Sequence, residues 1–180
     1  MDLTLTEFMK EQLNLVSTDF KRYMYDKLPW EARLVGLMGP RGVGKSTMVL
    51  QHIKEQAEDI QDKSLYVSAD HSYFSTHTQI YDSHPKLHVF FTGSSVLDIL
   101  EGEADLSRRV LLNDMQGLSF REFLELFHGI KTPVRSLKEV LEGKVQIEGV
   151  EHPFPLFEQY LREGYYPFSL EGYFQQRLQQ

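Results

Sequence analysis

The chain has 180 residues, enough for one domain or for one domain with a small appendage. Its 26 acidic residues outnumber its 19 basic residues, and the net charge of −7 argues against nucleic acid as the main partner of this segment, because phosphate neutralisation needs a basic surface. The chain has no cysteine, no signal-peptide pattern and no apolar run long enough to span a bilayer. We therefore expect a cytoplasmic protein with no disulfide framework and no membrane partner.

Residues 1–30 are predicted to form an amphipathic helix and the turn that ends it. Apolar residues recur with helical spacing through Phe8, Leu13, Val16 and Phe20. Pro29 is expected to end this helix, because proline lacks the backbone N–H that a helix interior needs.

Residues 31–118 alternate between strand-like and helix-like segments. Helical spacing covers residues 46–60 and 96–100. Short apolar runs, typical of buried parallel strands, occur at residues 34–38, 65–67, 87–91 and 110–112. This alternation predicts an α/β fold, in which a parallel sheet carries helices on its faces.

Residues 119–180 are predicted to be mainly helical and to form a C-terminal subdomain. Ser119 with Glu122, and Ser136 with Glu139, have the spacing of a capping box, which marks the start of a helix. The last part of the chain is rich in aromatic residues, and we expect them to pack in a core rather than to stack on a ligand.

A phosphate-binding motif follows the first predicted strand and opens the helix after it. We expect Lys45 to contact the β and γ phosphates, Ser46 to coordinate magnesium and Thr47 to contact the α phosphate. Glycines allow the backbone N–H groups to turn towards phosphate oxygens, and the helix dipole adds a positive field. The sequence therefore predicts that the chain binds ATP with Mg²⁺. The residues that fit the pattern G-x-x-x-x-G-K-[ST] are Gly39, Pro40, Arg41, Gly42, Val43, Gly44, Lys45 and Ser46.

Hydrolysis needs groups beyond the loop, usually an apolar strand that ends in an Asp-Glu pair, and the chain has no such strand. Asp70, just past the second predicted strand, is the nearest candidate for the magnesium shell, and a turn or helix cap is its alternative role. Ser94 follows the third strand and could sense the γ phosphate or belong to a helix cap. Arg108 and Arg109 precede the fourth strand and could neutralise phosphate charge in their own chain or in a neighbouring subunit.

Together these stretches resemble one group of bacterial AAA-type ATPases. The resemblance covers nearly the whole chain and is carried by residues 32–55, which contain GPRGVGKST, and by residues 65–78, 79–110, 117–130 and 152–168. It implies the fold of a P-loop ATPase and the hydrolysis of ATP to ADP and phosphate. By this resemblance residues 39–47 are the phosphate loop, residues 92–94 follow the sensor strand, and Arg108 or Arg109 is the arginine before the next strand.

One part of the family's pattern is missing from this sequence. In the family a helix, the strand that ends in the acidic pair (the Walker B strand) and a loop stand between segments like those that meet here at Thr78 and Gln79. A unit of roughly thirty residues is thus absent. A fragment, an internal deletion or a remnant that only binds ATP would each explain this, and residues 174–180 also end inside a predicted helix. We expect ATP binding with little or no hydrolysis.

Two other functional classes remain open from the sequence. A small-molecule or nucleotide kinase would suit the length, but it needs basic residues in a lid, for which only Arg108, Arg109 and Arg121 are candidates. A regulatory or scaffold protein would use ATP to order a surface for a protein partner or for homo-oligomerisation.

Overall fold

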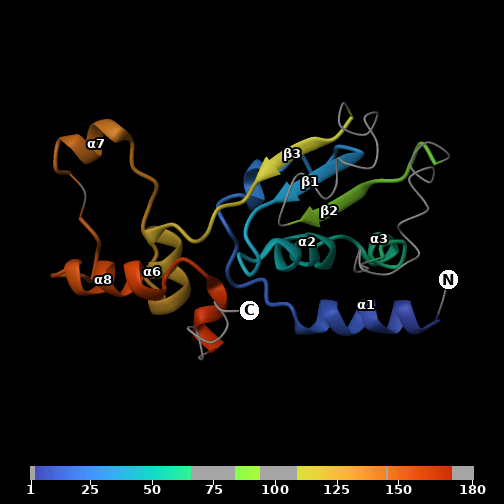
Figure 1. The fold of residues 1–180 in the computed structure, drawn as a ribbon, viewed down its shortest axis with the longest axis horizontal. Coiled ribbons are helices and arrows are strands. Elements are labelled where there is room, and N and C mark those ends of the chain that lie inside the picture. Colours follow the sequence, from blue (N-terminus) through green and yellow to red (C-terminus); the bar gives the residue numbers. More distant parts are fainter. Residues whose placement is uncertain (1–2, 66–83, 94–108, 145, 172–180) are drawn as a thin grey trace. The chain divides into compact units, whose positions relative to one another are not determined.

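A computed structural model of the chain describes residues 3–65, 84–93, 109–144 and 146–171 (Figure 1). The chain divides into two compact units, Met1–Met115 and Gln116–Gln180. This boundary lies three residues before the one predicted between residues 118 and 119. The predicted helix at residues 96–100 and all of the predicted second strand except Leu65 lie outside the described residues.

The first unit is built on a sheet of three described strands in the order β2-β1-β3. Strand β1 (Leu34–Met38) is central and pairs in parallel with β2 (Val89–Gly93) and β3 (Leu111–Asp114). Every residue of β1 is buried, as expected for a continuous apolar strand with a neighbour on each side. The parallel sheet and its helices confirm the α/β prediction, although the two outer strands begin one or two residues later than predicted.

Helix α2 (Lys45–Lys54) lies between the sheet and helix α1 (Leu3–Leu15), as Figure 1 shows. The predicted helix over residues 46–60 is divided in two, because α2 ends at Lys54 and α3 (Glu58–Gln61) begins after a break. The side-chain amide of Gln61 donates to the carbonyl oxygens of Lys54 and Gln56, at 3.1 and 2.7 Å. This amide satisfies backbone acceptors at the point where the helix is interrupted. The apolar contact between α1 and α2 is formed by Met9, Leu13, Val16 and Leu50, with Ile53 beside them.

The N-terminal helix is shorter than predicted, because α1 ends at Leu15 and not near Pro29. We call residues 16–24 the N-terminal strap. Side chains of α2 bind its backbone: Lys54 Nζ donates to the Val16 carbonyl oxygen at 2.7 Å, and Gln51 Nε2 donates to those of Ser17 and Phe20. These bonds give the strap's carbonyl groups the N–H donors that a helix would otherwise supply, so the helical spacing of its apolar residues is overridden.

The second unit is helical, as predicted. It contains α6 (Phe120–His128), α7 (Leu137–Leu141), α8 (Phe154–Glu163) and the 3-10 helix η4 (Pro167–Glu171). Both predicted capping boxes are present. The hydroxyl oxygens of Ser119 and Ser136 each accept a hydrogen bond from the backbone N–H three residues later, and each serine's own backbone N–H donates to the glutamate at that position.

Aromatic rings hold α6 and α8 together. Phe120 contacts Phe157 edge to face at 5.2 Å between ring centroids, and Phe123, which is fully buried, lies 5.6 Å from Tyr160. These contacts match the predicted packing role, whereas Phe154 at the start of α8 is 82% exposed. Within the part of the chain that the structure describes, no helix is both long and apolar enough to cross a bilayer.

Candidate nucleotide-binding site

The predicted phosphate loop joins the carboxyl end of β1 to the start of α2. Its three glycines, Gly39, Gly42 and Gly44, have φ angles of 140°, 84° and 93°. Residues that carry a side chain rarely adopt such φ angles, so the glycines allow the backbone of the loop to take this conformation. Gly44 is the N-cap of α2 and offers no side chain to the first helical N–H groups. A helix that starts in this way presents its first N–H groups, and the positive end of its dipole, to an anion.

Lys45 lies over the loop that precedes it. Its ammonium donates to the carbonyl oxygens of Gly39 and Pro40, at 2.7 and 2.8 Å. Partial burial lowers the pKa of Lys45, since a low-dielectric environment disfavours the charged form. Ser46 beside it is half-buried, and Thr47 is exposed. The charged group and the two hydroxyl groups predicted to meet phosphate and magnesium therefore share the first turn of α2.

The outer side of the loop is bound by the N-terminal strap. Arg22 is 5% exposed, and its guanidinium Nη1 donates to the carbonyl oxygen of Val43 at 2.6 Å. Val43 is itself fully buried. This bond joins the strap to the middle of the loop, 21 residues further along the chain.

A polar and aromatic cluster attaches the strap to the last turn of α2. Trp30 stacks on His52 with 3.9 Å between the ring centroids, and the Tyr25 hydroxyl donates to Glu55 at 2.6 Å. Burial, together with that bond, raises the pKa of Tyr25. The hydrogen bond from Lys21, followed by that from Tyr25, lowers the pKa of Glu55. Through Lys21, Tyr25 and Trp30, the cluster fixes the strap and the residues that follow it along the same helix whose first turn carries the loop.

The end of β3 supports the loop from another side. The Met115 N–H donates to the Met38 carbonyl oxygen at 2.8 Å, directly before Gly39. A Cβ atom placed on Gly39 would overlap the Met115 carbonyl oxygen, and one placed on Gly44 would lie 4.0 Å from the Met115 methyl group. Gly39 is thus required twice, for its φ angle and for this close approach.

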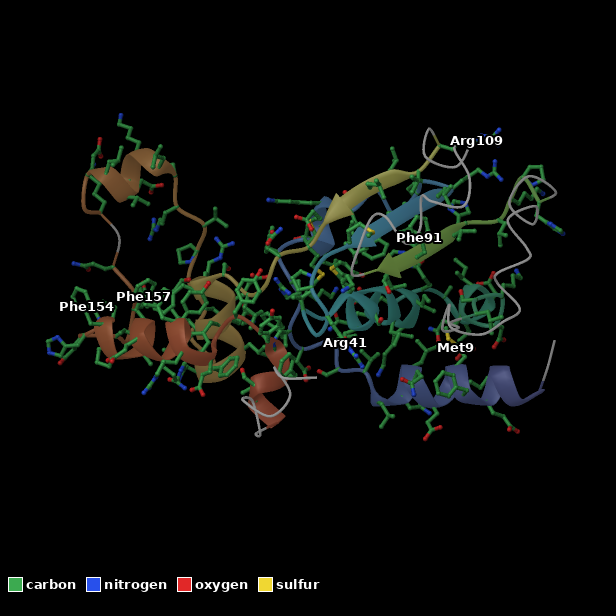
Figure 2. The ribbon with its side chains drawn as sticks, in the orientation of Figure 1. Met9, Arg41, Phe91, Arg109, Phe154 and Phe157 are labelled. Atoms are coloured by element: carbon green, nitrogen blue, oxygen red, sulfur yellow. The ribbon has the colours of Figure 1, made fainter. Side chains whose placement is uncertain are left out.

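The structure does not bring Arg109 to the loop of its own chain. Arg109 precedes β3, so it lies at the amino end of a sheet whose carboxyl end carries the loop. Figure 2 shows Arg109 and Arg41 at these opposite ends. Thr92 and Gly93, by contrast, end β2 in register with Leu37 and Met38, beside the loop.

Three other predicted residues, Asp70, Ser94 and Arg108, lie outside the described residues. Among the side chains that the structure describes, no group of three or more His, Asp or Glu residues could hold a metal ion. The Ser46 hydroxyl, in the first turn of α2, is a hard oxygen donor of the kind that magnesium accepts.

The groups that hold the predicted phosphate loop in place were not predicted from the sequence. Arg22 and Met115 belong to no motif, and each reaches the loop only through the tertiary fold. A lone arginine in an amphipathic segment gives no signal of a buried bond to a distant carbonyl group. The predicted end of the third strand, in contrast, did locate Thr92 and Gly93 next to the loop.

The strand, glycine loop and helix together have the arrangement typical of a phosphate-binding loop. A family model described as an AAA domain matches residues 31–80, less than a third of the chain. The match contains β1, the whole loop and α2, and it ends two residues past Thr78. It supports an AAA-type P-loop domain, and with it nucleotide binding, for this segment. No curated protein and no solved structure gave a significant match.

Proposed function

We propose that the chain is a Mg²⁺-ATP-binding module of the AAA type and that it binds ATP through residues 39–47. The observation that carries the proposal is the start of α2. Gly44, in a left-handed conformation, is its N-cap, and Lys45 and Ser46 follow at the carboxyl end of the central strand. Magnesium would supply charge neutralisation and orientation of the phosphates when bound.

In this proposal Lys45 acts without leaving the loop. An ammonium has three N–H donors, and the Gly39 and Pro40 carbonyl groups accept two of them. The third can meet a β or γ phosphate oxygen. A phosphate there would also offset the cost of burying the charge of Lys45. The backbone N–H groups of the loop and of the first turn of α2 would surround the remaining phosphate oxygens.

Hydrolysis is expected to be slow or absent, because the acidic pair of the AAA pattern has no counterpart in the sequence. Ser94, the next residue in the sequence after β2, and Asp70 remain candidates for contacts to the γ phosphate and to magnesium. Arg109, at the far end of the sheet, could meet a nucleotide only in a neighbouring copy of the chain. ATP binding could then order a surface for a protein partner or for homo-oligomerisation.

Calorimetric titration with Mg²⁺-ATP tests the binding. Removal of a charge-assisted contact in Lys45→Ala should raise the Kd by about ten- to a hundredfold. The control is Lys63→Ala, which removes a lysine whose side chain is 78% exposed and forms an ion pair with Asp59. Equal binding by both variants would contradict the loop assignment. Steady phosphate release by the 180-residue chain that Lys45→Ala abolishes would contradict the expected lack of hydrolysis.

A further inference from the structure

The bond between Arg22 and Val43 has a consequence for the phosphate loop. In a planar trans peptide the C=O of one residue and the N–H of the next point in opposite directions. The Arg22 guanidinium holds the Val43 carbonyl oxygen at 2.6 Å, on the side of the strap. The N–H of Gly44, in the same peptide unit, must therefore point to the other side of the loop.

That other side is where an anion would bind. Gly44 directly precedes the first turn of α2, and its φ of 93° is left-handed. Successive N–H groups around such a residue form a concave anion site. A flip of the Val43–Gly44 peptide would turn a carbonyl oxygen towards the phosphates and remove one N–H donor from the site.

The surroundings of Arg22 make the bond strong and specific. Arg22 is 5% exposed and Val43 is fully buried, so water competes little for either group. The strap that carries Arg22 is fixed separately along α2 by Lys54, which donates to Val16, and by Gln51, which donates to Ser17 and Phe20. The guanidinium is thus delivered to the loop from a segment that α2 itself holds in place.

We propose that Arg22 is a positioning residue for nucleotide binding: it fixes the orientation of the Val43–Gly44 peptide and thereby aims the Gly44 N–H at the phosphates. The inference rests on the proposed binding of ATP through the loop. The N-terminal strap thereby becomes part of the site. Arg22 acts through the Val43–Gly44 peptide and does not itself contact the nucleotide.

The orientation of this one peptide can be observed by NMR in the full chain. Only two valines precede a glycine in the sequence, Val35 and Val43. Labelling valine carbonyl carbons with ¹³C and glycine nitrogens with ¹⁵N therefore gives two correlated amide signals, from Gly36 in β1 and from Gly44 in the loop. The Gly36 signal serves as an internal control for the folded sheet.

The test compares the wild-type chain with Arg22→Gln, Arg22→Lys and Lys54→Met. Lys54→Met is the matched control, because it removes a bond between α2 and the strap without touching the loop. We expect Arg22→Gln to shift the Gly44 signal of the nucleotide-free protein, to leave the Gly36 signal in place and to raise the Kd for Mg²⁺-ATP about tenfold. Arg22→Lys, which keeps a charged donor, should give smaller changes in both. Lys54→Met should keep the wild-type Gly44 signal and Kd.

An unchanged Gly44 signal in Arg22→Gln, or an unchanged Kd, would overturn the proposal. Equal weakening of binding by Arg22→Gln and Lys54→Met would also overturn it, since the effect would then belong to the strap as a whole. If Arg22→Gln does not fold, Arg22→Lys decides by the same two readouts. Absence of ATP binding by the wild-type chain would contradict the proposed function, while the Gly44 signal of the free protein would still report whether Arg22 orients the peptide.

Discussion

The phosphate loop of the first unit and the helix starts of the second unit are fixed by different kinds of contact. In the first unit, side chains reach carbonyl groups far away in the sequence, as in the bonds from Arg22 to Val43 and from Lys54 to Val16, which span 21 and 38 residues. In the second unit, α6 and α7 start at capping boxes that span three residues, and aromatic rings pack α6 against α8. The loop is thus held by side chains from outside it, whereas α6 and α7 each carry a start signal in their own sequence.

The largest expected effect is on the aromatic packing of the second unit. Phe123 is fully buried and lies within 5.6 Å of Tyr160 and 4.6 Å of Phe127, centroid to centroid. Phe123→Ala should lower the free energy of unfolding of this unit by about 3–5 kcal/mol, measured by denaturant unfolding. Phe154→Ala, at a position that is 82% exposed, should change it by less than about 0.5 kcal/mol. Equal losses would show that the ring cluster is not the core of this unit.

The second effect compares two glycines with positive φ angles. Alanine at Gly39 would meet the Met115 carbonyl oxygen and adopt a φ of 140°, so Gly39→Ala should cost about 2–4 kcal/mol of stability and abolish ATP binding. At Gly129, which ends α6 with a φ of 68°, an added Cβ would meet nothing within 4 Å. Gly129→Ala should cost only about 1–2 kcal/mol and leave ATP affinity unchanged. Calorimetric titration measures the ATP affinity of the two variants, and denaturant unfolding measures their stability. Normal ATP binding by Gly39→Ala would contradict the expected clash between the added Cβ and Met115.

The sequence predicted those parts of the fold whose signals are local. The run from Leu34 to Met38 identified a strand, and Ser119 with Glu122 identified a helix start, because propensity and capping depend on neighbouring residues. The end of α1 at Leu15 was not predicted, because the carbonyl groups beyond it bind side chains of α2 that are far away in the sequence. Arg22 was missed for the same reason.

The third effect separates the two capping boxes of the second unit. In the box at Ser119 the partner Glu122 is 3% exposed, whereas the box at Ser136 is exposed to solvent. Ser119→Ala leaves a buried carboxylate with fewer donors and should cost about 1–2 kcal/mol, against about 0.5–1 kcal/mol for Ser136→Ala. Thermal unfolding of the two variants measures the difference. The reverse order would contradict the assigned burial of Glu122.

The smallest effect is a pH dependence at His52, which stacks on Trp30. Burial lowers the pKa of His52 below its usual 6.5, while Glu55 and Glu31 partly oppose this shift and Lys21 adds to it. The unfolded chain therefore takes up the proton first, and stability should fall as the pH falls from about 6.5 through the lower pKa of the folded state.

Trp30, the only tryptophan, reports this protonation because it stacks on His52. Its fluorescence should be quenched on acidification with a midpoint below 6.5, since an imidazolium quenches a stacked indole. His52→Gln should remove the transition, and His128→Gln, in the second unit, should retain it. A midpoint above 6.5 would mean that burial does not dominate the pKa of His52.

The loop is expected to bind a nucleotide by its phosphates. Titration of the wild-type chain with ATP, ADP and AMP in the presence of Mg²⁺ tests this most directly. The N–H groups of the loop and Lys45 are expected to surround the β and γ phosphates, which AMP lacks. ATP and ADP should therefore bind at least about tenfold more tightly than AMP. Equal affinity for all three nucleotides, or no binding of any of them, would contradict the account.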